Sequence, residues 1–353
     1  MSRFHLRVET RPNERRAALT PEGTARLIAA GHAVIVEESA QRVFPLADYV
    51  AAGAGTAPAG AWRDAPDEAI ILGLKELPEE TTPLRHRHVM FGHAYKGQLS
   101  GRALLGRFRA GGGTLLDMEY LVDPAGRRVA AFGYWAGFAG AGVTLLALAA
   151  QRRGGTLGPV EGWRDADALA AESRAGLEGP APTALIVGAA GRVGAGVADL
   201  LGRCGIAPTL WDKDETAEGG PFPQIAAHEL FFNCILARPG TPVFVDRAMA
   251  EGPRALRAIG DIACDPDSDY NPVPLYDAAT GWEAPVLRVA ADPPLDLMAI
   301  DNLPSLLPRE SSADFAGQLL PHLMALDEDP GGVWTRAAAE FARHAARDGT
   351  PAT

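Results

Sequence analysis

Lys75 and His93 are the side chains whose types and positions best suit proton-transfer chemistry. Lys75 follows the apolar run 69–72 and is flanked by Glu76, and His93 follows the apolar run 89–91. A lysine whose pKa is lowered by burial can act as a base near neutral pH, and histidine exchanges protons in the same range. The structural alternatives are a surface lysine paired with Glu76 and a hydrogen-bonded histidine at a strand end.

Three arginines are candidates for binding an anionic substrate. The planar guanidinium groups of Arg16, Arg127 and Arg128 suit two-point contacts with carboxylates. Arg127 and Arg128 precede an apolar run, so we expect one of them to face the protein and the other to face solvent; the alternative is a solvated pair in a loop. Glu119, at the end of a predicted strand over 114–121, is expected to tune the pKa of Lys75 by charge or else to form a structural ion pair.

Other chemistries have little support in the sequence. His86 and His88 lie in a charged turn and are predicted to face solvent. No set of His, Cys or acidic residues has the spacing of a zinc site, so we predict no metal. The serines lack a G-x-S-x-G context, which argues against a hydrolase.

Residues 183–194, TALIVGAAGRVG, indicate a dinucleotide site. An apolar strand leads into Gly188, Gly191 and Gly194, and a helix predicted over 193–204 follows. The three glycines permit a sharp turn, close approach of backbone N–H groups to a pyrophosphate, and close packing of helix on strand. Asp212 follows a second predicted strand, over 206–211, where a carboxylate binds the ribose hydroxyls and favours NAD over NADP.

The elements around these residues predict an α/β protein with two Rossmann-like domains and mostly parallel sheets. Strands and helices alternate along the chain, and Lys75, His93 and Glu119 all fall near strand ends, where ligands bind in such sheets. We expect an active-site cleft between the domains. The helices predicted over 312–326 and 333–347 are expected to return to the first domain.

Composition limits the partners. The chain has 353 residues, 47% hydrophobic residues and a net charge of −11, which argues against nucleic acid or an anionic membrane surface as partner. Three scattered cysteines predict no disulfide framework, and the charged N-terminus lacks a signal sequence. The best apolar run, 129–150, is interrupted by glycines and is predicted to be buried. We therefore expect a cytoplasmic protein that binds small molecules.

Several strings resemble the NAD-dependent, lysine-forming saccharopine dehydrogenases over nearly the whole chain. They are GLKELPE (73–79), FGHAYKGQ (91–98), GRRVAAFGYWAGFAGA (126–141), GGPF (219–222) and IDNLPSLLPRE (300–310). The opening ETRPNERRAALTP (9–21) is similar both to that family and to its alanine dehydrogenase and transhydrogenase relatives.

The resemblance implies a role for each matching residue. Lys75 matches the family's catalytic lysine and His93 its catalytic histidine. From their positions in the sequence, Glu76 and Glu119 are expected to be pKa-tuning groups. Substrate-binding positions are matched by Arg16, Gln98, Arg128, Phe132, Ala263, Cys264 and Asp265. NAD-binding positions are matched by Arg127, Gly188, Gly191, Arg192, Gly194, Asp212, Thr216, Leu236, Ile262, Ile300, Asp301, Asn302 and Leu303. The sequence departs from the family at Ala263–Cys264, within a Ser-Ala-Asp-like stretch, and at Leu236, where a tyrosine can stand.

The resemblance also implies an activity and a domain arrangement. The activity is reversible, NAD-dependent oxidative deamination of saccharopine to L-lysine and 2-oxoglutarate through an imine. The expected domains are 1–134 with 311–353 for substrate and catalysis, and 135–310 for NAD, in a monomer. Alternatives are an opine or amino-acid dehydrogenase with another amine partner, an alanine dehydrogenase-like enzyme, and a silent NAD-binding sensor; the presence of both Lys75 and His93 argues against the last.

Overall fold

The chain divides into two compact units. The computed structural model describes residues 1–347. The first unit comprises residues 1–131 and the described residues from Ser311 onward, and the second comprises Phe132–Glu310. The predicted domain boundary, at 134/135, lies three residues after the observed one, inside helix α4 (Gly133–Arg152). The first turn of α4 packs with the second unit because Tyr134 donates a hydrogen bond to Asp199 there.

The sheet of the first unit has six parallel strands in the order β3-β2-β1-β4-β5-β6. Strand β4 is buried along its whole length, as expected for a parallel sheet covered on both faces. The strands are β1 (Arg3–Leu6), β2 (Ala33–Glu37), β3 (Gly55–Ala57), β4 (Ile70–Leu72), β5 (Arg87–Met90) and β6 (Thr114–Asp117).

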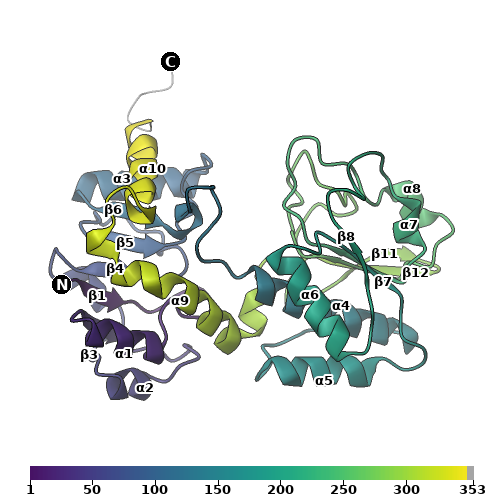
Figure 1. Cartoon of the computed structure of the whole chain (residues 1–353), viewed down its shortest axis with the longest axis horizontal. Helices are drawn as coiled ribbons and strands as arrows, with labels where there is room; N and C mark the ends of the chain where they lie inside the picture. Colours follow the sequence, from purple (N-terminus) through teal and green to yellow (C-terminus); the bar gives the residue numbers. More distant parts are fainter. Residues whose placement is uncertain (348–353) are drawn as a thin grey trace. The chain divides into compact units, whose positions relative to one another are not determined.

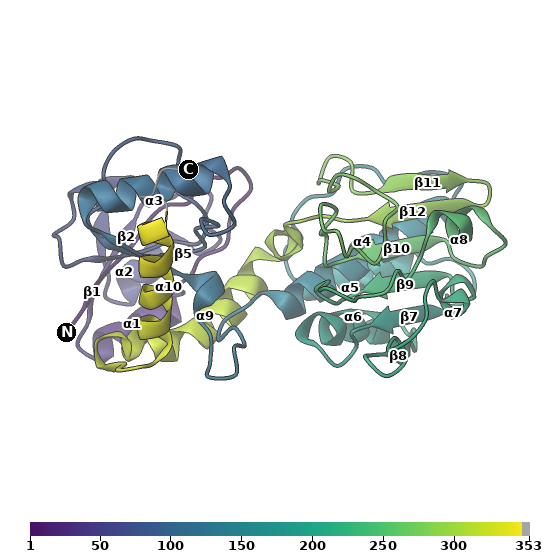
Figure 2. The same ribbon diagram turned by 90° about the horizontal axis from the view of Figure 1, so that it is seen from above.

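The helices of the first unit come from both ends of the chain. They are α1 (Pro21–Ala29), α2 (Leu46–Ala51), α3 (Leu99–Gly111), most of α9 (Pro308–Met324) and α10 (Val333–Arg347). Short 3₁₀ turns lie at η1 (Ala61–Asp64), η2 (Met118–Tyr120) and η4 (Leu326–Glu328). Thr20 caps α1 by accepting a hydrogen bond from the Gly23 N–H. Helix α10 lies beside β6 and α3 (Figures 1 and 2), so the chain's end does return to this sheet.

The second unit contains the other six-stranded sheet, in the order β11-β12-β10-β9-β7-β8. All its strand pairs are parallel except β11 with β12. Figure 1 shows α4, α5 and α6 on one side of this sheet and α7 and α8 on the other. The elements are β7 (Ala184–Val187), β8 (Thr209–Trp211), β9 (Leu230–Asn233), β10 (Ala258–Asp261), β11 (Leu287–Ala291), β12 (Pro294–Met298), α5 (Ala166–Gly176), α6 (Arg192–Arg203), α7 (Pro223–Ala226), α8 (Arg247–Glu251) and η3 (Leu303–Leu306).

Helix α4 is long and apolar enough to cross a membrane by length and composition alone. However, 78% of its most apolar window is buried inside the second unit. It packs against α5, α6, β10 and β12, and buried residues of these elements form one hydrophobic cluster with it. This is the environment of a core helix in a globular protein.

Three predictions about local structure were wrong. His86 and His88 are buried, because they belong to the interior strand β5 and its entry, and His88 lies between the rings of Trp62 and Phe108. The strand predicted over 114–121 ends at Asp117, whose side chain accepts a hydrogen bond from the Glu119 N–H and starts η2. The strand predicted over 206–211 begins only at Thr209, and β12 was missed.

Candidate active site

The sequence-predicted catalytic residues follow neighbouring strands of the first sheet. Lys75 comes three residues after β4, His93 three residues after β5, and Glu119 two residues after β6. The strand order reverses between β1 and β4, because β1 pairs with β2 on one side and β4 on the other. In parallel sheets this point, beyond the carboxyl ends of the strands, is where ligands bind. Lys75 therefore lies at the switch point of its sheet.

Lys75 has the electrostatic surroundings of a base. Burial lowers the pKa of its ammonium group, and the positive charges of Arg16 and Arg11 lower it further. The carboxylates of Glu14 and Glu76 act in the opposite direction. The net pKa lies below that of an ordinary lysine, so a larger fraction of Lys75 is neutral near physiological pH.

Glu14 is a site residue that the sequence analysis missed. Its carboxylate is buried and accepts hydrogen bonds from Arg16 Nε at 2.8 Å and Arg16 Nη2 at 2.7 Å. Burial alone would raise the pKa of Glu14, but Arg16 and the charge of Lys75 hold it below its usual value. The signal was present in the charged loop 9–16, where Glu14 stands two residues before Arg16.

The effect expected of Glu119 on the pKa of Lys75 stays a prediction. Glu119 lies on η2, past the end of β6, and the leading carboxylate influences on the pKa of Lys75 are those of Glu14 and Glu76. Glu119 also acts on Asp117, which is 1% exposed. Burial, together with the charges of Glu119 and Glu76, raises the pKa of Asp117 to about 7, against the hydrogen bonds from Glu119 N–H and Gly92 N–H.

His93 and Gln98 line a cavity of about 540 Å³ in the first unit. His93 Nε2 lies 3.4 Å from Glu76 Oε1, and its backbone is in the left-handed region, with φ of +46°. Other polar residues in the lining are Glu79, Glu80, Ser100 and Arg107. Glu76 connects this cavity to Lys75, its neighbour in sequence, so the structure brings Lys75, His93, Arg16 and Gln98 to one end of the sheet.

The paired arginines differ from expectation. Both Arg127 and Arg128 are exposed, whereas one was expected to face the protein. The hairpin-like turn 122–128 projects both side chains, and Arg127 Nη2 forms an ion pair with Asp123 at 2.9 Å. Phe132 precedes α4 and is half-buried.

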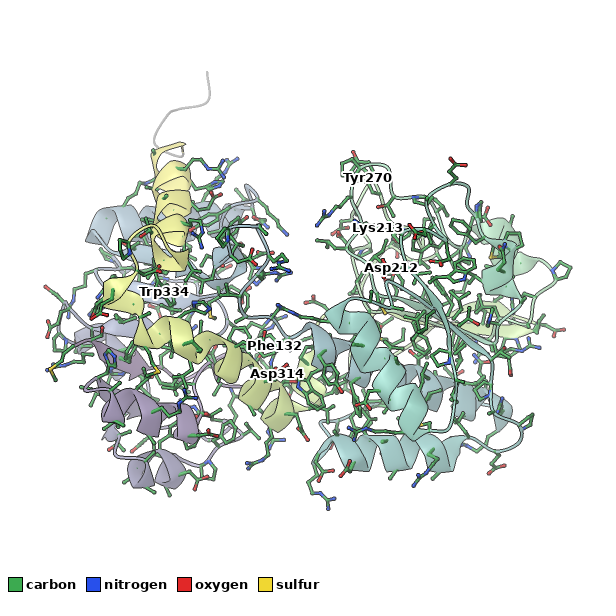
Figure 3. All side chains as sticks on the ribbon, in the orientation of Figure 1. Phe132, Asp212, Lys213, Tyr270, Asp314 and Trp334 are labelled. Carbon is green, nitrogen blue, oxygen red and sulfur yellow. The ribbon has the colours of Figure 1, made fainter. Side chains whose placement is uncertain are left out.

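A second cavity, of about 580 Å³, lies in the second unit beyond the ends of β7, β8 and β9. The strand order reverses here as well, between β7 and β9. Five of the predicted cofactor residues line this cavity: Gly188, Gly191, Asp212, Thr216 and Leu236. Figure 3 shows Asp212 beside Lys213, which also lines it.

The glycine-rich turn suits a pyrophosphate group. Gly188 has φ of +86°, which side chains other than glycine rarely adopt. A Cβ atom on Gly194 would overlap the backbone of Gly188 and Ala189, so helix α6 can approach β7 only with glycine there. Gly191 caps α6 with space for a ligand, since only the Gly188 carbonyl lies within 4 Å of a Cβ built there. The open helix N-terminus is suited to an anion.

Asp212 is placed to bind hydroxyl groups. It follows β8, and its Oδ2 accepts a hydrogen bond from the Ala190 N–H at 3.0 Å, which joins it to the glycine-rich turn. Thr216 donates its hydroxyl to the Asp212 carbonyl at 2.9 Å. A carboxylate has lone pairs beyond the ones used here, so Asp212 can still accept hydrogen bonds from a ribose.

The remaining predicted residues surround the other strand ends of the second unit. Ile262, Ala263, Cys264 and Asp265 follow β10, where buried Asp261 accepts a hydrogen bond from the Cys264 N–H. Ile300 and Leu303 are buried in the core, so they can offer a ligand only their backbone groups. Asp301 is exposed, Asn302 precedes η3, and Arg192 is the exposed first residue of α6.

Comparison with known proteins gives closely related sequences. A protein of Candida albicans named saccharopine dehydrogenase [NAD(+), L-lysine-forming] is 42% identical over 371 residues, covering 98% of this chain and 97% of the relative. A protein of Neurospora crassa with the same name is 44% identical, covering 96% of this chain and 95% of the relative.

More distant similarity extends to the fold. The family described as alanine dehydrogenase/PNT, N-terminal domain, matches residues 5–139. A solved structure titled L-alanine dehydrogenase aligns with a TM-score of 0.69 at 18% identity, over 97% of this chain and 94% of that one. This likeness confirms the predicted fold class, while the two curated relatives identify the family. The chain belongs to the family of NAD(+)-dependent, L-lysine-forming saccharopine dehydrogenases.

Proposed function

We propose that this chain catalyses the reversible NAD-dependent oxidative deamination of saccharopine to L-lysine and 2-oxoglutarate. The observation that carries the proposal is the 42–44% identity over almost the whole chain to relatives named for this activity. The placement of Lys75 and His93 after adjacent strands of one sheet supports the assignment of their roles. The first unit handles the substrate and the second unit binds NAD.

Lys75 acts as the base of the oxidative step. NAD⁺, when bound, accepts the hydride from the α-carbon of the glutarate half of saccharopine. Lys75 takes the proton from the secondary amine, and the substrate becomes an imine. The lowered pKa of Lys75 supports this role, because a base must be unprotonated before the step.

His93 acts in the hydrolytic step. It removes a proton from the water that attacks the imine carbon and passes this proton to the nitrogen, which gives the carbinolamine. It then takes the proton of the carbinolamine hydroxyl and delivers it to the nitrogen as the C–N bond breaks, so that L-lysine and 2-oxoglutarate leave. Glu76, 3.4 Å from His93 Nε2, can hold the protonated imidazole by charge.

In the first unit, Arg16 and Arg128 hold the substrate carboxylates and Gln98 contacts the substrate. In the second unit, substrate-binding roles are assigned to Phe132 and the segment Ala263–Asp265. Arg16 is fixed in direction by its contacts with Glu14, and Arg128 is exposed at its turn. Positioning of this kind supplies at most about 7–11 kcal/mol of barrier lowering.

The second unit holds NAD at the cavity beyond β7, β8 and β9. Gly188, Gly191, Gly194 and Arg192 surround the pyrophosphate, Asp212 binds the ribose hydroxyls, and Thr216 and Leu236 form part of the wall. The Cβ-free surface at Gly191 supports this fit. The other residues of this unit to which NAD-binding roles are assigned are Ile262, Ile300, Asp301, Asn302 and Leu303. In the first unit, the same role is assigned to Arg127.

The protein acts as a cytoplasmic monomer on small molecules, without nucleic acid or membrane. The net charge of −11 supports this view, because polyanions would be repelled. The alternatives of another amine partner or of an alanine dehydrogenase-like reaction are less favoured, since the relatives of high coverage are named for saccharopine.

Steady-state NADH consumption tests the proposal. Purified protein is given 2-oxoglutarate with L-lysine, L-ornithine, L-alanine or ammonia in separate reactions. We expect turnover with L-lysine at a kcat/KM at least about tenfold above the other amines, as expected for a site that pairs specific groups. Equal or greater turnover with another amine would favour an alternative dehydrogenase, and NADH that binds without turnover would leave a sensor.

A further inference from the structure

We propose that Arg7 and Glu9 are positioning residues for Lys75. Together they form hydrogen bonds with the backbone N–H groups of Leu74 and Lys75 and with the carbonyl oxygen of Lys75. The inference rests on the proposed function in one respect, the role of Lys75 as the base. Arg7 and Glu9 themselves touch no reacting group and act through the segment that carries Lys75.

The contacts come from the segment that follows β1. Glu9 Oε1 accepts a hydrogen bond from the Leu74 N–H at 2.7 Å, and Glu9 Oε2 accepts one from the Lys75 N–H at 3.0 Å. The guanidinium of Arg7 donates to the carbonyl oxygen of Lys75. Arg7 Nη1 also lies 3.4 Å from Glu9 Oε2, so the two side chains form one charged pair around the lysine's backbone.

This pair continues the hydrogen bonding of the sheet after its ladder has ended. Strands β1 and β4 are neighbours, and β4 ends at Leu72. Beyond it, the Leu74 carbonyl still accepts a hydrogen bond from the Phe91 N–H of the next chain segment. The Leu74 N–H, the Lys75 N–H and the Lys75 carbonyl are bonded by Glu9 and Arg7 instead. Without that pair they would lose partners in a largely buried region.

The burial of the pair indicates that it is specialised. Arg7 is 2% exposed and Glu9 is 8% exposed. Charged side chains are rarely buried to this extent unless they are paired and hydrogen-bonded. The space for Arg7 depends on Gly73, because a Cβ there would overlap the guanidinium. Gly73, two residues before Lys75, therefore leaves the space that the Arg7 guanidinium occupies.

A double-mutant cycle separates positioning from general destabilisation. Glu9→Gln keeps the shape of the side chain but replaces one acceptor oxygen, and Arg7→Lys keeps the charge but loses the fork. We expect each to lower kcat roughly 10- to 100-fold, since small misplacements of a catalytic group have effects of that size, with the KM for NADH unchanged. In a Lys75→Met background the same substitutions should lower kcat less than about threefold, because the group that they position is gone.

Arg254→Met serves as the matched control. Arg254 also donates its guanidinium to three backbone carbonyls, those of Ala250, Leu256 and Pro293, but it does so in the second unit. Its substitution should affect stability without changing the coupling to Lys75. Equal losses of kcat from Glu9→Gln in the wild-type and Lys75→Met backgrounds would overturn the proposal.

Amide hydrogen exchange of the full-length protein tests the same clamp without any substrate. We expect the Leu74 and Lys75 amides to exchange at least about tenfold faster in Glu9→Gln than in wild type, with Arg254→Met unchanged at these positions. Unchanged exchange of the Leu74 and Lys75 amides in Glu9→Gln would refute the proposal that Arg7 and Glu9 hold this backbone segment. If the protein fails to turn over L-lysine with 2-oxoglutarate, the proposed function fails, and exchange still decides whether the pair holds this segment.

Discussion

At the scale of single residues, the proposed chemistry depends on Lys75 being able to exist without its proton. The buried setting and the charges of Arg16 and Arg11 lower its pKa, and Glu14 limits the shift. A base in this state is available at lower pH than an ordinary lysine. The proton-transfer role therefore follows from the environment of Lys75 rather than from its side-chain type alone.

Lys75→Met should remove a pH-dependent limb from saccharopine oxidation. In the wild type, kcat/KM should rise with pH until Lys75 is deprotonated, with a midpoint below the ordinary lysine pKa. We expect the substitution to lower kcat/KM by roughly 10²–10⁴-fold, the usual contribution of general base catalysis, and to abolish that limb. NADH binding, measured by fluorescence titration, should stay the same. An unchanged limb in Lys75→Met would assign the base to another group.

His93→Gln should slow the reaction in both directions by a comparable factor. Its partner Glu76 and the wall of its cavity remain, so substrate binding should change less than kcat. His228→Gln is the control, because His228 is a half-buried histidine of the second unit whose ring nitrogens contact Thr209 and the Gln224 carbonyl. Similar kcat values for both variants would contradict the role given to His93.

Asp117 should titrate near neutral pH. Burial and nearby carboxylates raise its pKa from 3.8 to about 7. The folded protein then binds more protons at this site than the unfolded chain between about pH 4 and pH 7, so the contribution of Asp117 to stability is largest at low pH and is lost as pH rises through that range. Carboxyl-carbon NMR, assigned with Asp117→Asn, should give a midpoint near 7; a midpoint near 4 would contradict the expected effect of burial.

At the scale of elements, the contact of helix α6 with β7 should depend on one glycine. Gly194→Ala places a Cβ against the backbone of Gly188 and Ala189, so we expect a loss of about 1–3 kcal/mol in the free energy of unfolding and weaker NADH binding. Gly202→Ala, on the same helix, meets nothing within 4 Å and should be neutral or stabilising by up to about 1 kcal/mol. Urea unfolding and NADH titration of both variants check this. Equal behaviour of the two would contradict close packing at Gly194.

The elements also show how far the sequence could be read. The run 183–194 predicted strand, turn and helix correctly, because the conformations that its apolar residues and glycines favour locally are the ones they adopt in the folded protein. The burial of His86 and His88 could not be predicted from their charged neighbours, since it depends on distant segments. His88 packs on Trp62 and Phe108, and the His86 ring is hydrogen-bonded to the Ala65 carbonyl. Strand β12 was missed because Pro293 precedes it and Pro294 is its first residue, and a pair of prolines usually marks a loop.

Site residues divided in the same way. Lys75 and His93 were predicted as site residues because they follow apolar runs, and strand ends are recognisable from sequence. Local spacing does not reveal the influence of Glu14 on the pKa of Lys75. It does not reveal the hydrogen bonds of Arg7 and Glu9 to the Leu74–Lys75 backbone either, because these follow from the pairing of β1 with β4.

At the scale of the whole molecule, the second unit is one uninterrupted segment with its own sheet and hydrophobic clusters. We expect a fragment of residues 132–310 to fold and to bind NADH within about tenfold of the affinity of the whole chain, because the proposed pocket is built from this unit. Circular dichroism and NADH fluorescence titration measure both properties. A folded fragment that does not bind NADH would contradict the proposal that the NAD pocket is built from this unit.

The most direct test of the central claim is identification of the bond that the enzyme makes. The protein is incubated with 2-oxoglutarate, NADH deuterated at both C4 positions, and L-lysine labelled with ¹⁵N at the ε-nitrogen or, separately, at the α-nitrogen. We expect saccharopine in which the ε-nitrogen is bonded to a glutarate α-carbon that carries one deuterium, as tandem mass spectrometry would show. A product joined through the α-nitrogen, or a deuterated amino acid formed without lysine, would contradict it.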